Sequence, residues 1–198
     1  MVERQLRRRG VEDERVLAAM GSIPRELFVP ERERRRAYRD GALEIGAGQT
    51  ISQPWIVARM AELLVLRGDE RVLEVGTGSG YAAAVLSRLC SELITVERHE
   101  SLARGAAELL RELGCDNVEV RAGDGTRGAP DTAPFDAISV TAAALDAPPA
   151  ALLEQLRPGG RLICPVERDG EELLTRFQDG RVEPIVPVRF VPLVREDG

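Results

Sequence analysis

The chain has 198 residues, 43% of them hydrophobic, and a formal net charge of −6. This length and composition predict one domain, spanning 1–198, that buries ~70% of the surface exposed in the unfolded chain, and the negative charge disfavours a nucleic-acid partner. All 27 basic residues are arginine and His99 is the only histidine, which excludes Schiff-base chemistry, a phosphate-binding-loop lysine and a histidine-rich metal site.

The first part of the chain, 1–65, does not follow the strand and helix alternation of the rest and is interpreted as a helical extension. Apolar spacing predicts a short helix over 11–20. A second helix is predicted over 31–39, where glutamates are interspersed among arginines. This mixture of charges is typical of a solvated face rather than an anion site. We expect the extension to precede an α/β core that covers 66–198.

A polar segment with two glycines, over 46–53, interrupts this extension. It ends just before a predicted helix whose first turn holds a proline and whose apolar stripe starts at Ile56. Two interpretations are open from the residues alone. Either Ser52 or Gln53 caps the helix, or the segment belongs to a functional site and becomes ordered over a bound ligand.

The most informative motif joins a buried strand over 72–75 to a helix over 81–86. The strand is apolar and β-branched, as expected of a parallel strand covered on both faces, and the helix is rich in alanine. Between them lie Gly76, Gly78 and Gly80. These glycines allow a sharp turn and a close approach of the backbone to a ligand.

The next strand, over 93–96, ends at Glu97. Nucleotide-binding βαβ units place an acid on the ribose hydroxyls about 20 residues past the first glycine, which predicts a cofactor that carries an adenosine. Tyr81 occupies the position of the third glycine of a dinucleotide fingerprint. The carboxylate of Glu74 would repel a pyrophosphate but suits a cationic amino or sulfonium group. We therefore expect S-adenosyl-L-methionine rather than NAD.

The alternation continues to the end of the chain and predicts an α/β fold with a doubly wound, mostly parallel sheet of seven strands and a Rossmann-like arrangement. The third strand leads to Asp124, an acid between two glycines at the sheet edge where such folds bind ligands. Its carboxylate accepts from an adenine amine, or it is a turn residue. The other predicted elements are a helix over 101–113, strands over 118–120, 135–140 and 161–166, a helix over 152–156, a turn over 158–160 and a hairpin from 173 onward.

These motifs resemble those of the protein-L-isoaspartate (D-aspartate) O-methyltransferase family, whose members repair isoaspartyl residues formed as asparagine and aspartate age. The resemblance covers nearly the whole chain. Its most specific parts are the Gln-Thr-Ile-Ser-Gln-Pro segment over 49–54 and the Phe-Val-Pro-Leu tail over 190–193, whereas many methyltransferases share the glycine loop. The resemblance implies the S-adenosylmethionine-dependent methyltransferase fold.

The resemblance also implies a set of site residues. Ser52 is the implied active-site hydroxyl, Glu97 is expected to hold the ribose, and Asp124 and Gly125 are expected to face the adenine. The residues that the resemblance places against the cofactor are Gln49, Thr50, Ile51, Ser52, Glu74, Gly76, Gly78, Ser79, Glu97, Asp124 and Gly125.

The implied reaction methylates the free carboxylate of L-isoaspartyl residues, and D-aspartyl residues are a further implied substrate. A carboxylate with a pKa near ~4 is ionised at neutral pH, so it attacks the sulfonium methyl without a general base. The enzyme supplies in-line placement and excludes water, and Ser52 orients the carboxylate through a hydrogen bond. In the family, the methyl ester then closes to a succinimide, whose hydrolysis partly regenerates aspartate.

Two alternatives to general repair are left open. One is a methyltransferase of the same family dedicated to an aspartate of one particular peptide, and the other is a cofactor-binding module without catalysis. A nucleic-acid methyltransferase is disfavoured because the fourth strand leads into Val-Thr-Ala-Ala rather than a motif that holds an extruded base. The sequence departs from the family pattern at Glu44, Ala47 and Glu167 and in a tail that ends soon after Val194. These departures concern the affinity for the substrate more than the type of reaction.

The remaining expectations concern the thiols, the compartment and the partners. Cys90, Cys115 and Cys164 are predicted to be buried free thiols because they are far apart and lack metal-ligand spacing. No apolar stretch approaches the ~20 residues needed to cross a bilayer, and the first residues lack the apolar region of a signal peptide. We expect a cytoplasmic monomer without metal, membrane or nucleic-acid ligands that acts on isoaspartyl-containing proteins and peptides.

Overall fold

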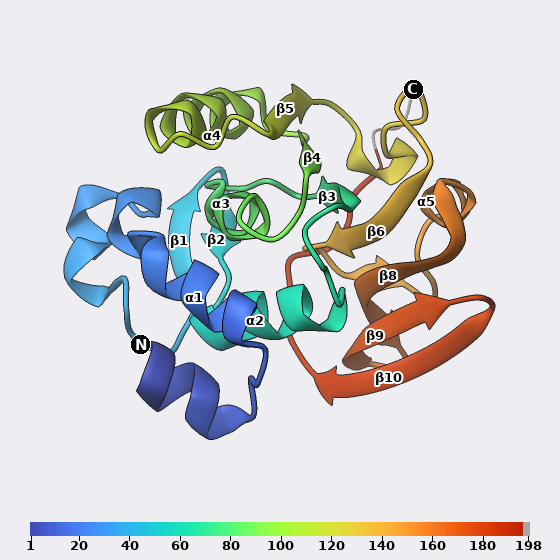
Figure 1. Ribbon diagram of the computed structural model, residues 1–198, viewed down its shortest axis with the longest axis horizontal. Coiled ribbons are helices and arrows are strands. Elements are labelled where there is room, and N and C mark those ends of the chain that lie inside the picture. The colour runs from blue at the N-terminus through green and yellow to red at the C-terminus, as the bar shows by residue number, and fades with distance from the viewer. Residues whose placement is uncertain (196–198) are drawn as a thin grey trace.

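The computed structural model describes residues 1–195, and a mostly parallel sheet flanked by helices forms its centre (Figure 1). The helices are α1 (Glu14–Ser22), α2 (Pro54–Leu63), α3 (Tyr81–Leu86), α4 (Glu100–Glu112) and α5 (Ala150–Glu154). The strands are β1 (Leu43–Gly46), β2 (Gln49–Ile51), β3 (Arg71–Val75), β4 (Glu92–Glu97), β5 (Val118–Ala122), β6 (Phe135–Val140), β7 (Ala144–Leu145), β8 (Leu156–Arg168), β9 (Glu171–Gln178) and β10 (Arg181–Pro187). Shorter helical segments are Val2–Leu6, Arg7–Arg9, Arg25–Phe28, Glu31–Arg36 and Gly125–Arg127.

The main sheet confirms the predicted α/β class. Seven strands follow one another in the order β10-β9-β8-β6-β3-β4-β5, and the two-residue β7 pairs with β8 as an eighth. β5, β4, β3, β6 and β8 are parallel, whereas β9 and β10 add to one edge as an antiparallel hairpin. Because β3 lies between β4 and β6, the winding direction reverses beside it. Such a switch point leaves a crevice at the carboxyl ends of the strands.

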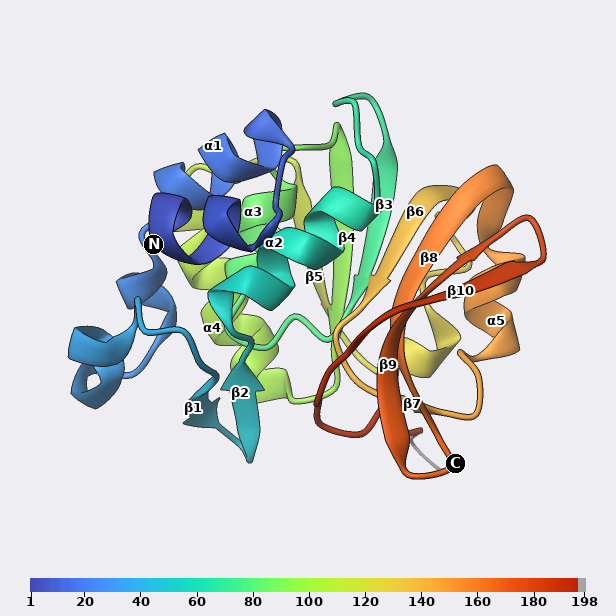
Figure 2. The same ribbon diagram turned by 90° about the horizontal axis from the view of Figure 1, so that it is seen from below.

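Alternate residues of the central strands pack on opposite faces of the sheet. On β3, Val72 packs into the apolar cluster formed by α1, α2, α3 and part of α4, whereas Leu73 and Val75 pack into the cluster that includes Leu152 of α5. Figure 2 shows α1, α2 and α3 on one side of the sheet and α5 on the other. Burying one such aliphatic side chain contributes about 1.5–3 kcal/mol to the stability of the fold. The packed sheet therefore holds the loops at its edge in fixed positions.

The N-terminal segment differs in detail from the expected pair of helices. α1 begins only at Glu14 because Asp13 caps it, its carboxylate accepting from the amides of Arg15 at 2.8 Å and Val16 at 3.2 Å. The charged stretch forms a 3-10 helix, Glu31–Arg36, rather than the longer predicted helix. Without an apolar stripe, no tertiary packing stabilises a longer helix there.

The glycine-containing segment is a short hairpin, in which β1 pairs antiparallel with β2. Its turn holds Ala47 at φ +50° and Gly48 at φ +70°, a left-handed pair typical of two-residue hairpin turns. The interpretation that a side chain caps α2 is not supported. Gln53 occupies the N-cap position without a side-chain capping bond, and its amide donates to Asp40 at 2.5 Å instead.

The predicted turn over 158–160 was wrong, because it lies inside a strand. α5 ends at Glu154 and β8 already begins at Leu156. Leu156 pairs with Phe135, and the register shifts before the next pair. This irregularity accommodates the Pro-Gly-Gly sequence without ending the strand.

The segment after β10 returns to the carboxyl end of β6. The amide of Ala143 donates to the carbonyl of Val191 at 2.8 Å, and the amide of Leu193 donates to the carbonyl of Ala143 at 2.7 Å. Figure 2 shows this tail and the β1–β2 hairpin at the same end of the sheet. Segments from both ends of the chain therefore meet beside the glycine loop.

Candidate active site

The glycine loop after β3 is shaped by a close contact with Thr141. Gly76 has φ +98°, and a Cβ atom there would lie 2.3 Å from Oγ1 of Thr141. The Thr141 hydroxyl donates to the Gly76 carbonyl at 2.6 Å. Gly76 follows β3 and Thr141 follows the adjacent β6, so two parallel strands bring both residues to the carboxyl edge of the sheet.

Glu97 ends β4 beside this loop and is only 4% exposed. Its carboxylate accepts from the amide of Gly78 at 2.8 Å through one oxygen and from the amide of His99 at 2.9 Å through the other. These bonds fix the glycine loop against β4. Each carboxylate oxygen keeps a further lone pair for a ligand, so the ribose contact predicted for Glu97 stays compatible with its structural role.

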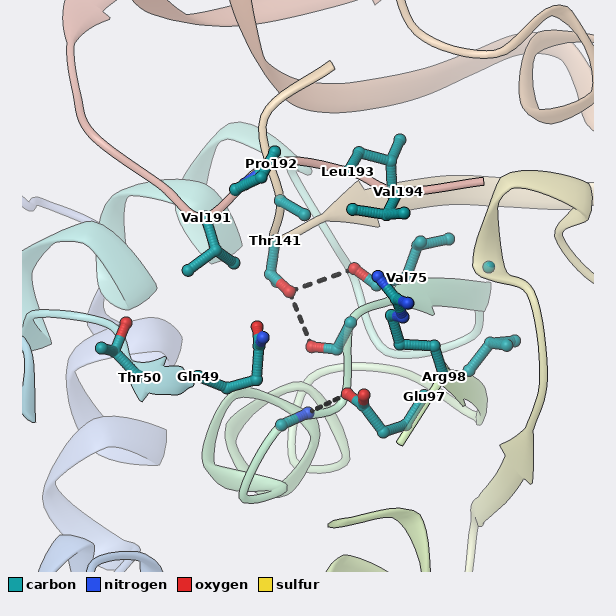
Figure 3. Close-up of a pocket in the computed structure, with 15 residues that line it drawn as sticks. Gln49, Thr50, Val75, Glu97, Arg98, Thr141, Val191, Pro192, Leu193 and Val194 are labelled. Atoms are coloured by element: carbon teal, nitrogen blue, oxygen red, sulfur yellow. Dashed lines mark hydrogen bonds between the residues drawn. The ribbon is translucent and has the colours of Figure 1, made fainter. Parts of the chain in front are cut away.

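A cavity lies at this edge, and we call it the loop cavity. Figure 3 shows Gln49 and Thr50 across it from Glu97 and Arg98, with Thr141 and Val191 along a further side. The predicted site residues that it brings together are Gln49, Thr50, Gly76, Gly78, Glu97 and Gly125. The other lining residues are Val75, Val96, Arg98, Thr141, Ala142, Val191, Pro192, Leu193 and Val194.

Several predicted cofactor residues lie outside this lining. Ile51 is buried in β2, and Ser79 is part of the glycine loop without lining the cavity. The carboxylate of Asp124 accepts from the amide and the hydroxyl of Thr126, at 2.9 and 2.7 Å. That is the turn role the sequence left open, while the adjacent Gly125 does line the cavity.

Glu74 is fully buried beneath the loop and does not line the cavity. One carboxylate oxygen accepts from the Thr95 hydroxyl at 2.6 Å, and that hydroxyl is 2.6 Å from the hydroxyl of Thr77. The other oxygen has no hydrogen-bond partner within residues 1–195. Burial raises the pKa of Glu74 to about 8, against the opposing bond from Thr95. The side chain is therefore largely protonated at neutral pH, and its contact with a cofactor stays a prediction.

A second cavity of about 310 Å³, which we call the serine cavity, adjoins the loop cavity. Ser52, Gln53 and Trp55 line it at the start of α2. The Ser52 hydroxyl makes no hydrogen bond to any other described residue, so it is available to a ligand. The residues that line both cavities are Thr50, Thr141 and Val191. A group beside Ser52 therefore borders directly on the loop cavity.

The charged residues of the serine cavity are both arginines, Arg9 and Arg189. The guanidinium of Arg9 lies over the Trp55 ring at 4.6 Å and pairs with Asp40 at 2.8 Å. No aspartate or glutamate is among the described residues that line the cavity. This balance of charge favours an anionic ligand such as a carboxylate.

Some lining residues were missed by the sequence analysis as site residues. Arg98 directly follows the predicted acid, and Thr141 and Ala142 directly follow a buried strand, a position that in open α/β sheets borders the ligand crevice. That rule offered a signal for all three. The tail over 191–194 served only as a mark of resemblance, because nothing local in the sequence indicates that it returns to β6.

The departures from the family pattern fall in different places. Glu44 and Glu167 line neither cavity, whereas Val194 lines the loop cavity. The end of the tail, 196–198, lies outside the described residues. The three cysteines are buried and free, as predicted. Within 1–195, no group of His, Cys, Asp and Glu side chains could hold a metal ion, and no helix is long and apolar enough to cross a membrane.

Fold and site together define the class. A doubly wound sheet, a glycine loop after its central strand and an acid at the end of the neighbouring strand are the features of α/β proteins that bind an adenosine cofactor. Within this class, the family model for protein-L-isoaspartate (D-aspartate) O-methyltransferase matches residues 1–198. The chain belongs to this family.

Individual relatives agree with this assignment. A protein-L-isoaspartate O-methyltransferase of Pelotomaculum thermopropionicum is 54% identical, over 100% of this chain and 88% of the relative. A solved protein-L-isoaspartate O-methyltransferase has a TM-score of 0.84 at 31% identity; the match covers 97% of this chain and 65% of that one. A candidate member from Plasmodium falciparum, solved with S-adenosyl-L-homocysteine, has a TM-score of 0.84 at 27% identity, over 95% of this chain and 94% of that one.

Proposed function

We propose that this protein transfers a methyl group from S-adenosyl-L-methionine to the free carboxylate of L-isoaspartyl residues in damaged proteins and peptides, and that D-aspartyl residues are also substrates. The methyl ester would then start repair through a succinimide. One observation carries the proposal: the loop cavity and the serine cavity share Thr50, Thr141 and Val191. A carboxylate held by Ser52 is thereby adjacent to the cavity that suits the cofactor.

The residues of the loop cavity fit an adenosine cofactor. Gly76 and Gly78 bring bare backbone to its wall, where a Cβ on Gly76 would be 2.3 Å from Thr141. Glu97 supplies acceptor oxygens for ribose hydroxyls. In this proposal Gly125 faces the adenine, and Gln49, Thr50 and the glycine loop hold the methionine end. When bound, the cofactor would supply an electrophilic methyl group on a sulfonium.

The protein contributes placement rather than acid or base catalysis. An aspartyl-type carboxylate is already ionised at neutral pH, and the positive charge of Arg189 favours that form, whereas the charge of Arg9 is already paired with Asp40. The Ser52 hydroxyl would donate to one carboxylate oxygen, which would leave the other oxygen to form the new bond to the methyl carbon as the bond from that carbon to sulfur breaks and S-adenosyl-L-homocysteine is left as product. No proton is transferred in this step. Correct alignment of two reactants can supply about 7–11 kcal/mol of the barrier.

The replacement Ser52→Ala tests this role. A hydrogen bond to a charged group contributes about 1.5–3 kcal/mol, so we expect methyl transfer to an isoaspartyl peptide to fall about 10- to 100-fold while binding of S-adenosyl-L-homocysteine changes little. Ser101→Ala, at an exposed position of α4, is the matched control and should transfer methyl groups at the rate of wild type. Equal turnover of Ser52→Ala and wild type would contradict the proposal. Activity on one peptide sequence only would indicate the dedicated alternative.

We further propose that 1–198 acts as one domain, as a monomer in the cytoplasm, without nucleic-acid or membrane partners. The net charge of −6 supports the absence of a nucleic-acid partner. The guanidinium of Arg25 in the N-terminal extension lies 4.7 Å from the centre of the Tyr81 ring in the α/β core, which supports a single folding unit. Light scattering at several protein concentrations and a urea titration test this. A dimer, or two separate unfolding transitions, would contradict it.

A further inference from the structure

Arg25 is the only arginine in residues 1–195 that is fully buried, with 0% of its surface exposed. It belongs to the short helical segment Arg25–Phe28, which packs against both the segment before α2 and the start of α3. Burying a guanidinium lowers the stability of the fold unless its charge is compensated and its N–H groups donate hydrogen bonds. The contacts of Arg25 show which groups it organises.

The guanidinium of Arg25 holds two backbone carbonyls and lies over an aromatic ring. Nε donates to the carbonyl of Ala37 at 2.7 Å, and Nη2 donates to the carbonyl of Ser52 at 2.7 Å. The ring of Tyr81, the first residue of α3 after the glycine loop, lies 4.7 Å below. The Arg25 fork therefore joins three segments that are distant in sequence.

No carboxylate among the described residues forms an ion pair with Arg25, and Nη1 has no hydrogen-bond partner there. Burial accordingly lowers the pKa of this guanidinium, with the Tyr81 ring partly offsetting the effect. A neutral aliphatic side chain of similar volume would avoid this desolvation cost. The structure therefore uses Arg25 for the directions of its N–H donors rather than for the stability of the fold.

The bond to Ser52 has a direct geometric consequence. The peptide group is planar, and its carbonyl and amide point in opposite directions. Fixing the Ser52 carbonyl therefore fixes the plane of the peptide that follows it. Together with the preceding peptide, which follows the paired strand β2, that plane sets the direction in which the Ser52 side chain leaves the backbone toward the serine cavity.

We infer that Arg25 is a positioning residue for methyl transfer, which holds the Ser52 segment in register with the glycine loop through the Ser52 carbonyl and the Tyr81 ring. This inference rests on the proposed function, because it assigns Arg25 a role through Ser52. Arg25 lines neither cavity and so would not touch substrate or cofactor. Displacing a reactive group by about 1 Å can cost 100-fold in rate.

The variant Arg25→Lys tests the inference because it keeps the charge but loses the planar fork that reaches two carbonyls at once. We expect its kcat with an isoaspartyl peptide to fall 10- to 100-fold, with the Kd for S-adenosyl-L-homocysteine within about threefold of wild type. Leu89→Ala is the matched control. Leu89 is buried in the same apolar cluster, just beyond the end of α3 opposite Tyr81, and lines neither cavity, so the variant loses core packing away from the groups that Arg25 contacts. Its kcat should stay within threefold.

A double-mutant cycle with Ser52→Ala separates positioning from general stability. If Arg25 acts through Ser52, adding Arg25→Lys to Ser52→Ala should lower kcat by less than threefold. An equal loss in both backgrounds, a loss matched by Leu89→Ala, or a large loss of S-adenosyl-L-homocysteine binding by folded Arg25→Lys would overturn the inference. If Arg25→Lys does not fold, as judged by loss of its cooperative urea unfolding transition, Arg25→Gln enters the same cycle with the same criteria. A wild-type protein inactive on isoaspartyl peptide would refute the proposed function instead.

Discussion

The protonation of Glu74 gives a quantitative test of how the sheet edge is built. Its pKa is raised from 4.5 to about 8. Between these values the unfolded chain carries an ionised Glu74 while the folded protein keeps it protonated, so the folded state binds more protons and its stability falls as pH rises. Each pKa unit corresponds to about 1.4 kcal/mol. Ionisation of Glu74 therefore costs the folded state up to about 5 kcal/mol above pH 8.

The variant Glu74→Gln removes this titration while keeping an acceptor for the Thr95 hydroxyl. The free energy of unfolding of Glu74→Gln minus that of wild type should rise by up to about 1.4 kcal/mol per pH unit between pH 5 and 8. Urea titrations at pH 5, 6, 7 and 8 without cofactor measure it. Glu108→Gln, an exposed position on α4, is the control and should show a constant difference. A constant or falling difference for Glu74→Gln would refute the reasoning.

Two further predictions concern the glycine loop and the β1–β2 hairpin. Gly76→Ala should abolish binding of S-adenosyl-L-homocysteine that calorimetry can detect, and should destabilise the fold by about 1–3 kcal/mol. The reasons are the φ of +98° at Gly76 and the 2.3 Å that would separate the new Cβ from Oγ1 of Thr141. Unchanged binding would contradict the geometry. Ala47→Gly should raise the free energy of unfolding by up to about 1 kcal/mol in urea, because a φ of +50° strains alanine and suits glycine. A loss of stability would show that the turn is not left-handed.

The core of the fold was predictable because local sequence determines it. The strands over 72–75 and 135–140 are mostly apolar, as expected of a sheet covered on both faces, although Glu74, Asp136 and Ser139 interrupt them. Glu97 was predictable from its spacing to the glycines. By contrast, β1 and β2 have only four and three residues. The alternation of Leu43 and Ile45 with their neighbours in β1 is too short to mark a strand.

The parts of the site that depend on distant contacts were not predictable. Thr141 packs on Gly76 from another strand, and the tail reaches β6 through two backbone bonds near Ala143. Backbone hydrogen bonds place no requirement on side-chain type, so the residues that form them carry no recognisable pattern in the sequence. Arg25 was not predicted as a site residue, because an arginine in a sequence is expected at the surface. Its burial follows only from three segments closing around it.

The most direct test of the account compares two peptides that differ only in an isoaspartyl versus a normal aspartyl linkage. Both are incubated with S-adenosyl-L-methionine labelled in its methyl group, and base-labile label is measured on each peptide. The account predicts methylation of the isoaspartyl peptide and none of the normal one, because the isoaspartyl linkage leaves the α-carboxylate free, whereas the normal linkage leaves only the side-chain β-carboxylate, which is placed differently relative to the backbone. Equal labelling of both peptides, or labelling of neither while S-adenosyl-L-homocysteine still binds, would contradict it.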